Sequence, residues 1–218
     1  MVDIIVLVKQ MPDLEQIKAD PSTGEPMIKN VPLKMETLSE NAIEAAVQVK
    51  EKNGGKVTAI IFGDTQSSSI MKKAYAMGVD EGYVITGYAG NNPPYTAKVL
   101  ADKISKIKHD LVILGNQSAD SITGLLSGMI SKLLAEPLLG NASSIEISSG
   151  VARIRRILED RTTLTSAKMP AIISVTQEIN QPRLPAVMQI LAAGRKPIKT
   201  EPTPFPHVEY TKILSNRA

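Results

Sequence analysis

The stretch DLVILGNQSADSITGLLSGMISKLL, residues 110–134, decides the predicted fold and holds the most informative candidate site. Its apolar run from Leu111 to Leu114 ends at Gly115, which is typical of a strand buried on both faces. After a polar loop, apolar residues recur at helical spacing: Ile122, Leu125, Leu126, Met129, Ile130 and Leu133. The stretch therefore predicts a strand, a loop and a helix, the repeating unit of an α/β protein.

The loop of this unit is a candidate anion site. We expect Asp120 or Ser121 to cap the helix, and Ser121, Thr123 and Gly124 to offer hydroxyls and free backbone amides in its first turn. Unpaired N–H groups and the helix dipole both favour a phosphate at a helix start. The same loop and cap also occur in α/β units without a ligand, and the chain has neither a G-x-G-x-x-G nor a G-x-x-x-x-G-K-[ST] motif.

Composition narrows the classes of function. The chain has 218 residues, 43% apolar and 22% charged, which is typical of a soluble globular protein. A net charge of +3 with five Tyr, two Phe and no Trp offers bases little to stack on, so we expect no nucleic-acid partner. The lack of cysteine excludes disulfides and thiolate metal sites, and His109 and His207 lack a metal-ligand spacing. Without a membrane-length apolar run or a signal-peptide pattern, we expect a cytoplasmic protein with no membrane insertion.

Strand and helix patterns alternate up to residue 134. Apolar runs at 4–8, 57–62 and 83–86 predict strands. Helical patterns occupy the segments between and after them, which are 37–53 with the capping box Thr37-x-x-Glu40, about 67–78, and 95–107. The alternation predicts an α/β fold: a mostly parallel, Rossmann-like sheet with helices on both faces. Ligands of such sheets bind beyond the carboxyl ends of the strands, so the loops after Val8, Phe62 and Leu114 should converge on one crevice.

The C-terminal third has a different pattern. Residues 141–147 and 151–158, joined by Ser148-Ser149-Gly150, predict an antiparallel hairpin whose cluster of Arg153, Arg155 and Arg156 is either a solvated strand face or a contact surface. Strands at 162–165 and 171–175 and a short helix at 186–193 should follow. From Lys196 the chain is proline-rich and should be extended. We therefore expect a nucleotide-binding domain at 1–198 and an extended tail at 199–218 that docks a partner, with packing of the tail on its own domain as the alternative.

The residues do not form a recognisable catalytic constellation. No histidine lies near a candidate nucleophile, and no two carboxylates share a motif. Asp13, Glu40, Asp64 and Asp120 could face the crevice, but loop and cap roles explain each of them. The residues alone predict an α/β nucleotide-binding protein without a hydrolytic site.

Five stretches together resemble the small (beta) subunit of electron-transfer flavoproteins. They are VLVKQMPD at 6–13, ENAIEAAVQVKEK at 40–52, KKAYAMGVDEGYVI at 72–85, DLVILGNQSADSITG at 110–124 and MPAIISVTQEINQPRLPAVMQILAAGRKPI at 169–198. They occur in the family's order and spacing and cover most of residues 1–198. The resemblance implies an electron carrier without catalytic residues of its own, rather than an enzyme with a separate active site.

The resemblance also implies cofactors and partners. A larger alpha subunit would hold and share the redox FAD, and the heterodimer would pass electrons from donor dehydrogenases to a quinone- or ferredoxin-linked acceptor. The crevice of the beta subunit would hold AMP, or a second FAD in electron-bifurcating members, and both ligands stay open for this chain. The positions that the resemblance assigns to the nucleotide are Leu7, Lys9, Glu36, Thr37, Leu38, Ser39, Phe62, Gly63, Asn116, Gln117, Asp120, Ser121, Ile122, Thr123 and Gly124.

The family's partner-recognition loop falls on residues 180–193. This resemblance places the docking residues at Asn180, Pro182, Arg183, Val187 and Met188. Val187 occupies a position where the family usually has a leucine that anchors in the dehydrogenase, which indicates a different partner pocket.

The chain departs from the family's pattern in two further places. The family's Arg-Glu pair followed by glycines reads here Arg156-Ile157 and then Glu159-Asp160-Arg161, which weakens a flavin-facing role at those positions. The chain stops at Ala218, so part of the family's C-terminal extension is expected to be missing.

A stand-alone adenine-nucleotide sensor or a relative of the ATP pyrophosphatases is the alternative. The pyrophosphatase reading would require a Ser-Gly-Gly phosphate loop after the first strand. The chain has Lys9-Gln10-Met11-Pro12 there, which favours the electron-transfer subunit.

Overall fold

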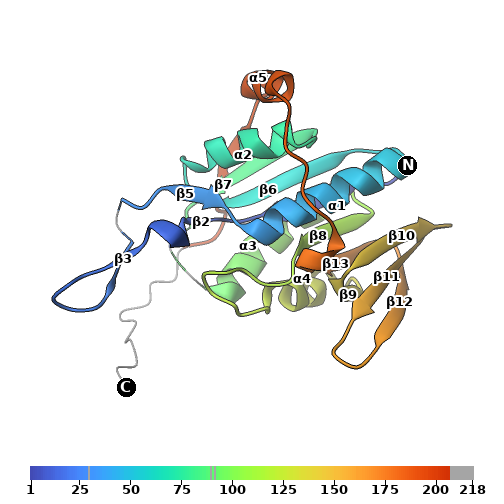
Figure 1. Ribbon diagram of the computed structural model, residues 1–218. Coiled ribbons are helices and arrows are strands. Elements are labelled where there is room, and N and C mark those ends of the chain that lie inside the picture. Colours follow the sequence, from blue (N-terminus) through green and yellow to red (C-terminus); the bar gives the residue numbers. More distant parts are fainter. Residues whose placement is uncertain (29, 89, 91, 207–218) are drawn as a thin grey trace.

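A parallel sheet forms the centre of the molecule (Figure 1). The computed structural model describes residues 1–28, 30–88, 90 and 92–206. The strands of the central sheet are β1 (Ile4–Val8), β6 (Val57–Gly63), β7 (Glu81–Thr86), β8 (Leu111–Gly115), β9 (Leu138–Ala142), β13 (Ala171–Val175) and β14 (Lys199–Pro202). They are hydrogen-bonded in the order β14-β7-β6-β1-β8-β13-β9, and all neighbours run parallel. The predicted α/β fold is confirmed.

Helices cover both faces of this sheet. They are α1 (Thr37–Asn53), α2 (Ser67–Ala76), α3 (Pro93–Ser105), α4 (Leu126–Leu134) and α5 (Val187–Arg195). Side chains of β1 alternate between the faces: Ile4 and Val6 belong to the core under α1 and α2, and Ile5 and Leu7 to the core under α3 and α4. Each such fully buried side chain contributes about 1.5–3 kcal/mol. The buried β-branched runs of the sequence thus form a three-layer fold.

The strand order creates a crevice at the centre of the sheet. From β1 the chain adds β6 and β7 on one side and then returns to add β8, β13 and β9 on the other. The loops that leave β1 and β8 therefore run to opposite faces, and a gap opens between them at the carboxyl ends of these two strands. This is the edge on which the sequence predicted convergent loops.

A second, antiparallel sheet consists of β10 (Ser144–Ser148), β11 (Val151–Ile157) and β12 (Thr162–Lys168). The predicted hairpin is confirmed, and Ser149 and Gly150 both have positive φ angles, 49° and 78°, which fit a tight hairpin turn. Its first arm begins at Ser144 instead of the expected residue 141. The preceding residues join the central sheet as β9, since Leu139 and Ala142 are buried there.

Short segments between β1 and α1 extend from the sheet. β2 (Gln10–Pro12) pairs with β5 (Leu33–Met35), and β3 (Lys18–Ala19) pairs with β4 (Pro26–Met27) at the base of a long loop. A 3-10 turn, η1 (Leu14–Gln16), lies between them, and a second one, η2 (Gln177–Ile179), follows β13. This Pro- and Gly-rich region therefore contains two small antiparallel strand pairs (Figure 1).

The first part of the tail packs on the same domain. β14 pairs with β7, the hydroxyl of Tyr95 donates to the carbonyl of Phe205 at 3.0 Å, and Lys103 forms an ion pair with Glu201 at 2.8 Å. Lys199–Pro202 thus extends the sheet, and residues 207–218 of the predicted docking tail lie outside the described residues. Within the described part of the chain, no helix is both long and apolar enough to cross a membrane.

Candidate functional site

A cleft lies at the carboxyl ends of β1, β6 and β8, where the strand order reverses. Its empty volume of about 850 Å³ includes space that is open to solvent. Lys9 and Gln10 follow β1, residues 114–118 end β8 and begin its loop, and residues 121–126 lead into α4. The loops that the sequence predicted to converge do meet here.

The floor of the cleft is apolar. Leu7, Ile60, Phe62 and Leu114 come from three adjacent strands, and α3 adds Leu100. These side chains are buried because each belongs to the core between the sheet, α3 and α4. The rings of Phe62 and Tyr88 meet edge to face with centroids 5.4 Å apart, so aromatic rings form part of the apolar lining. Such a surface suits a flat, apolar ligand group.

The rim of the cleft is polar and centred on Lys9. Its Nζ donates to Asp120 Oδ1 at 2.6 Å and to Ser118 Oγ at 2.9 Å, and Ser118 Oγ lies 2.9 Å from Ser121 Oγ. Burial raises the pKa of Asp120, but hydrogen bonds from Lys9 and Ser118 outweigh it and hold the pKa below the usual 3.8. Asp120 is therefore ionised at neutral pH, and it fixes Lys9 at the rim.

The start of α1 closes the cleft from one side. Glu36, only 3% exposed, caps the helix by accepting the N–H of Ser39 at 2.9 Å, so the cap is Glu36 and not the expected Thr37. Lys9 N–H donates to Ser39 Oγ at 3.0 Å, and Glu36 N–H donates to the carbonyl of Lys9 at 3.0 Å. Burial raises the pKa of Glu36. These bonds join the end of β1 to the start of α1.

The predicted start of the helix after β8 is wrong. α4 begins at Leu126, so neither Asp120 nor Ser121 caps it. Ile122 and Gly124 have φ angles of 49° and 62°, which a right-handed helix excludes. The side chains of Ser118, Asp120 and Ser121 bond to one another and to Lys9, which stabilises a loop in place of the first helical turn. Ile122 is 66% exposed and does not belong to the apolar stripe.

Lining residues from this loop and from β2 carry polar groups without a partner in the described ranges. The backbone N–H groups of Thr123 and Gly124 donate to no other residue among those the structure describes. The buried Oε1 of Gln10 likewise has no partner in the described part of the chain. Backbone N–H groups are normally hydrogen-bonded, so a ligand with acceptor atoms would satisfy those of Thr123 and Gly124.

Most residues that the resemblance assigned to a nucleotide come together here. Those lining the cleft are Leu7, Lys9, Glu36, Ser39, Phe62, Asn116, Gln117, Ser121, Thr123 and Gly124. Those adjacent to the lining are Thr37, Leu38, Gly63, Asp120 and Ile122. Lining residues that the sequence did not indicate include Val8, Gln10, Ile60, Tyr88, Pro93, Thr96, Leu100, Gly115, Ser118, Leu125 and Leu126. The loop after β7, which carries Tyr88, could have been found by applying the strand-end rule to every strand.

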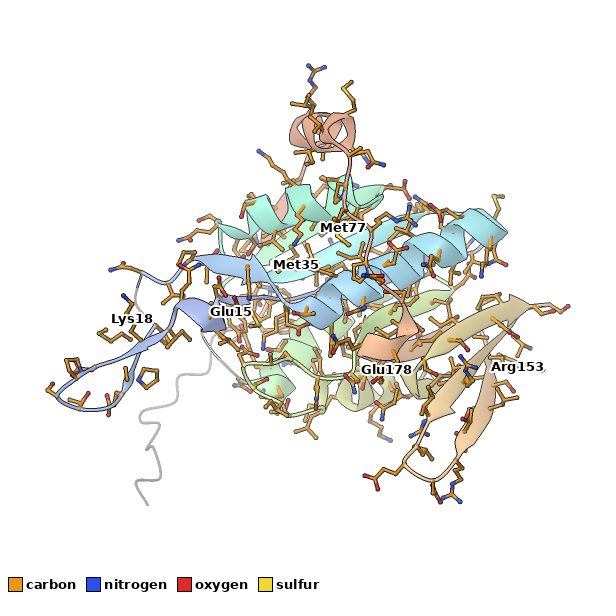
Figure 2. The ribbon with its side chains drawn as sticks, in the orientation of Figure 1. Glu15, Lys18, Met35, Met77, Arg153 and Glu178 are labelled. Atoms are coloured by element: carbon orange, nitrogen blue, oxygen red, sulfur yellow. The ribbon has the colours of Figure 1, made fainter. Side chains whose placement is uncertain are left out.

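The residues expected at a docking surface lie elsewhere, on residues 180–195, called the projecting segment hereafter. Its helix α5 stands beyond α2 at the edge of the molecule, with outer side chains that point away from the sheet (Figures 1 and 2). Val187 and Met188 are 71% and 75% exposed. Asn180 and Arg183 instead bond to α1. The expected docking residues thus divide into an exposed group and a group engaged within the chain.

Fold and cleft define an α/β protein with a cleft at the switch point of a parallel sheet, and comparison with known proteins gives its family. Residues 27–205 match the family model of the electron transfer flavoprotein domain. The electron transfer flavoprotein subunit beta of Thermoanaerobacterium thermosaccharolyticum is 35% identical over 196 residues, which are 89% of this chain and 75% of that protein. The chain belongs to the electron transfer flavoprotein family, as a member of its beta-subunit group.

Two further relatives show the breadth of this group. The subunit CarD of the caffeyl-CoA reductase-Etf complex of Acetobacterium woodii is 32% identical over 89% of this chain and 76% of its own length. The subunit beta of Dictyostelium discoideum is 31% identical over 91% of this chain and 80% of its own length. The electron-transfer role indicated by the sequence is confirmed at the level of the family.

Proposed function

We propose that this chain is the beta subunit of a heterodimeric electron transfer flavoprotein and that its cleft holds an adenine nucleotide, either AMP or a second FAD. The cleft at the switch point, with an apolar floor and a polar rim, carries this proposal. Membership of the family supports the electron-transfer role. The resemblance to the family implies the nucleotide, and the chemistry of the lining supports it.

The cleft suits the two ends of an adenylate. Leu7, Ile60 and Phe62 offer an apolar bed for a base. At the rim, the free N–H groups of Thr123 and Gly124 and the cation of Lys9 would bind a phosphate. Asp120 would hold Lys9 in place without touching the phosphate.

The proposal includes two kinds of partner. An alpha subunit would hold the redox FAD and share it with this chain, and a donor dehydrogenase would dock on the projecting segment, whose exposed Val187 and Met188 suit an apolar pocket. Electrons would pass from the donor through the FAD of the alpha subunit to a quinone- or ferredoxin-linked acceptor. This chain would position cofactor and donor and would perform no bond chemistry of its own.

Titration of AMP into the isolated chain tests the nucleotide site. The double variant Ser121→Ala/Thr123→Ala removes two rim hydroxyls, each worth about 0.5–1.5 kcal/mol net, so its affinity should fall about tenfold or more. The matched control is Thr165→Ala/Ser166→Ala, which removes the same groups from exposed positions on β12, and its affinity should equal that of the wild type. Equal affinities of wild type and both variants would reject the two hydroxyls as phosphate contacts.

A further inference from the structure

The projecting segment has little core of its own. Within α5 the only buried residue is Ala193, although every residue of the helix is described. Leu184, Ile190 and Leu191 are exposed in addition to Val187 and Met188. A nine-residue helix with so little burial is marginal by itself in water. Contacts outside the helix must therefore hold the segment in its position.

One arginine makes most of these contacts. Arg183 Nε donates to Glu44 Oε2 at 2.7 Å and Nη2 donates to Glu44 Oε1 at 3.0 Å, a two-pronged pair with one carboxylate. The same guanidinium reaches Glu51 with Nη1 at 2.7 Å and Nη2 at 3.1 Å. The backbone N–H of Arg183 donates to Glu44 as well, at 3.2 Å. Both carboxylates lie on α1, so the segment is tied to the most deeply packed helix of the fold.

The charges of this cluster are those of a permanent ion pair. Glu44 is only 4% exposed. Burial raises its pKa, but hydrogen bonds from Arg183 and Gln48 outweigh burial and hold the pKa below the usual value. The two carboxylates raise the pKa of Arg183. A planar guanidinium matches two carboxylates in a fixed geometry that an ammonium group does not reproduce, so position is specified as well as charge.

Further bonds hold the segment on both sides of α5. Before the helix, Asn41 Nδ2 donates to the carbonyl of Asn180 at 2.9 Å, and Asn180 Nδ2 donates back to the carbonyl of Asn41 at 3.0 Å. After the helix, Lys196 Nζ donates to the carbonyl of Val79 at 2.8 Å, and the hydroxyl of Tyr75 donates to the carbonyl of Pro197 at 2.6 Å. The exposed apolar residues therefore lie on a span fixed at both ends.

We propose that Arg183 is a positioning residue: its clamp on Glu44 and Glu51 holds the projecting segment in the conformation that a donor protein binds. Arg183 was expected to contact the donor because the resemblance placed it in the docking loop, but its guanidinium is already engaged by two carboxylates of its own chain. The inference rests on the proposed docking of a donor at this segment. The apolar side chains touch the donor, and Arg183 acts through them.

The physical effect of the clamp is preorganisation. Ordering a loose segment at the moment of binding opposes association, whereas a segment already held in its bound conformation avoids that entropic loss. Loss of the clamp should weaken donor binding and leave the electron-transfer step within the bound complex unchanged. In steady-state terms, KM for the donor rises and kcat stays constant.

Two measurements on the heterodimer with its alpha subunit test the clamp, with Arg183→Gln and the conservative Arg183→Lys as variants. Hydrogen exchange reports the order of residues 184–195, and steady-state reduction reports KM and kcat. The probe is the flavin-dependent dehydrogenase of the same cells that reduces the wild type fastest. In Arg183→Gln, exchange should quicken and KM should rise, each by about tenfold, at unchanged kcat. Arg183→Lys keeps the positive charge, so its exchange and its KM should both lie between those of wild type and Arg183→Gln.

The matched control is Lys50→Gln. Lys50 also lies on α1 and donates to the carbonyl of Gly78 at 2.8 Å and to Asp80 at 3.0 Å, but it does not touch the segment. Its variant should leave exchange in residues 184–195 and KM unchanged. Unchanged exchange in Arg183→Gln, or a lowered kcat at constant KM, overturns the proposal.

Val187→Ala separates failure of the clamp from failure of the docking assignment. A raised KM in Val187→Ala with a normal KM in Arg183→Gln overturns the clamp and retains the docking surface. A normal KM in both variants overturns the docking assignment, and with it the clamp's role in donor binding.

Discussion

The cleft and the projecting segment differ in what surrounds their functional groups. The cleft is cut into the core of the sheet, so its floor is fixed by packing and its polar groups either bond to one another or point into the gap. The projecting segment has apolar side chains in solvent, and its Asn180 and Arg183 side chains bond to α1. The first arrangement suits a small ligand with apolar and charged ends, and the second suits a protein.

The largest expected effect comes from matched truncations in the two regions. Ile60→Ala removes a fully buried side chain beneath the cleft and should cost about 2–5 kcal/mol in the free energy of unfolding. Ile190→Ala removes an exposed side chain on α5 and should cost less than about 0.5 kcal/mol. Urea unfolding of the isolated chain measures both variants. Equal costs would mean that α5 is buried in solution and would remove the contrast between the regions.

Arg183→Gln should have the next largest effect on stability. It leaves the buried carboxylate of Glu44 without its cation, which costs about 3–5 kcal/mol in fully buried pairs. Arg183 is about a third exposed and Gln48 also donates to Glu44, so we expect about 1–3 kcal/mol. The double variant Glu44→Gln/Arg183→Gln removes the uncompensated charge and should be more stable than Arg183→Gln alone. An additive double variant would show that the two side chains do not interact.

Val187→Ala should leave the unfolding free energy within about 0.5 kcal/mol of wild type, because the side chain is 71% exposed. Its reduction by the donor should slow by about twofold to tenfold through a higher KM, since an apolar anchor in a partner's pocket contributes about 0.5–1.5 kcal/mol. Stopped-flow reduction over a range of donor concentrations measures this effect. Equal rates across a panel of donors would remove Val187 from the docking surface.

The smallest effect is a pH dependence of the clamp. The folded pKa of Glu44 lies below its usual 4.5, so the stabilisation is fully present above pH 4.5 and is lost as the pH falls through the lower folded value. Arg183, Gln48 and Glu51 surround this carboxylate, and Arg183 stays charged throughout. Between pH 6 and about pH 3, the free energy of unfolding should therefore fall less in Glu44→Gln than in wild type. Identical slopes would assign the acid sensitivity to other groups.

Local patterns in the sequence predicted the elements that depend on adjacent residues alone. The buried run at Leu111–Leu114 and the Gly150 turn carry their structure in a few adjacent residues. The predicted start of α4 was wrong because Ile122 has helical spacing by coincidence. Contacts of Ser118 and Asp120 with distant Lys9 determine the conformation of the loop. Such contacts leave no trace in a local window.

Two other features follow from pairings between remote parts of the chain. β14, with the sequence Lys-Thr-Glu-Pro, has no apolar pattern and is a strand because it pairs with β7 and because Lys103 binds Glu201. Arg183 and Glu44 are 139 positions apart. Resemblance to the family placed Arg183 in the predicted docking loop, but only the fold shows that its guanidinium is directed inward, toward Glu44.

Nucleotide content of the purified heterodimer tests the central claim most directly. Denaturation of the complex, followed by chromatographic and mass-spectrometric identification of what is released, counts the adenine nucleotides held. The cleft described here predicts AMP or a second FAD in addition to the FAD of the alpha subunit, and a lower content in Ser121→Ala/Thr123→Ala. A heterodimer that transfers electrons while releasing a single FAD and no other adenine nucleotide would contradict the assignment of the cleft.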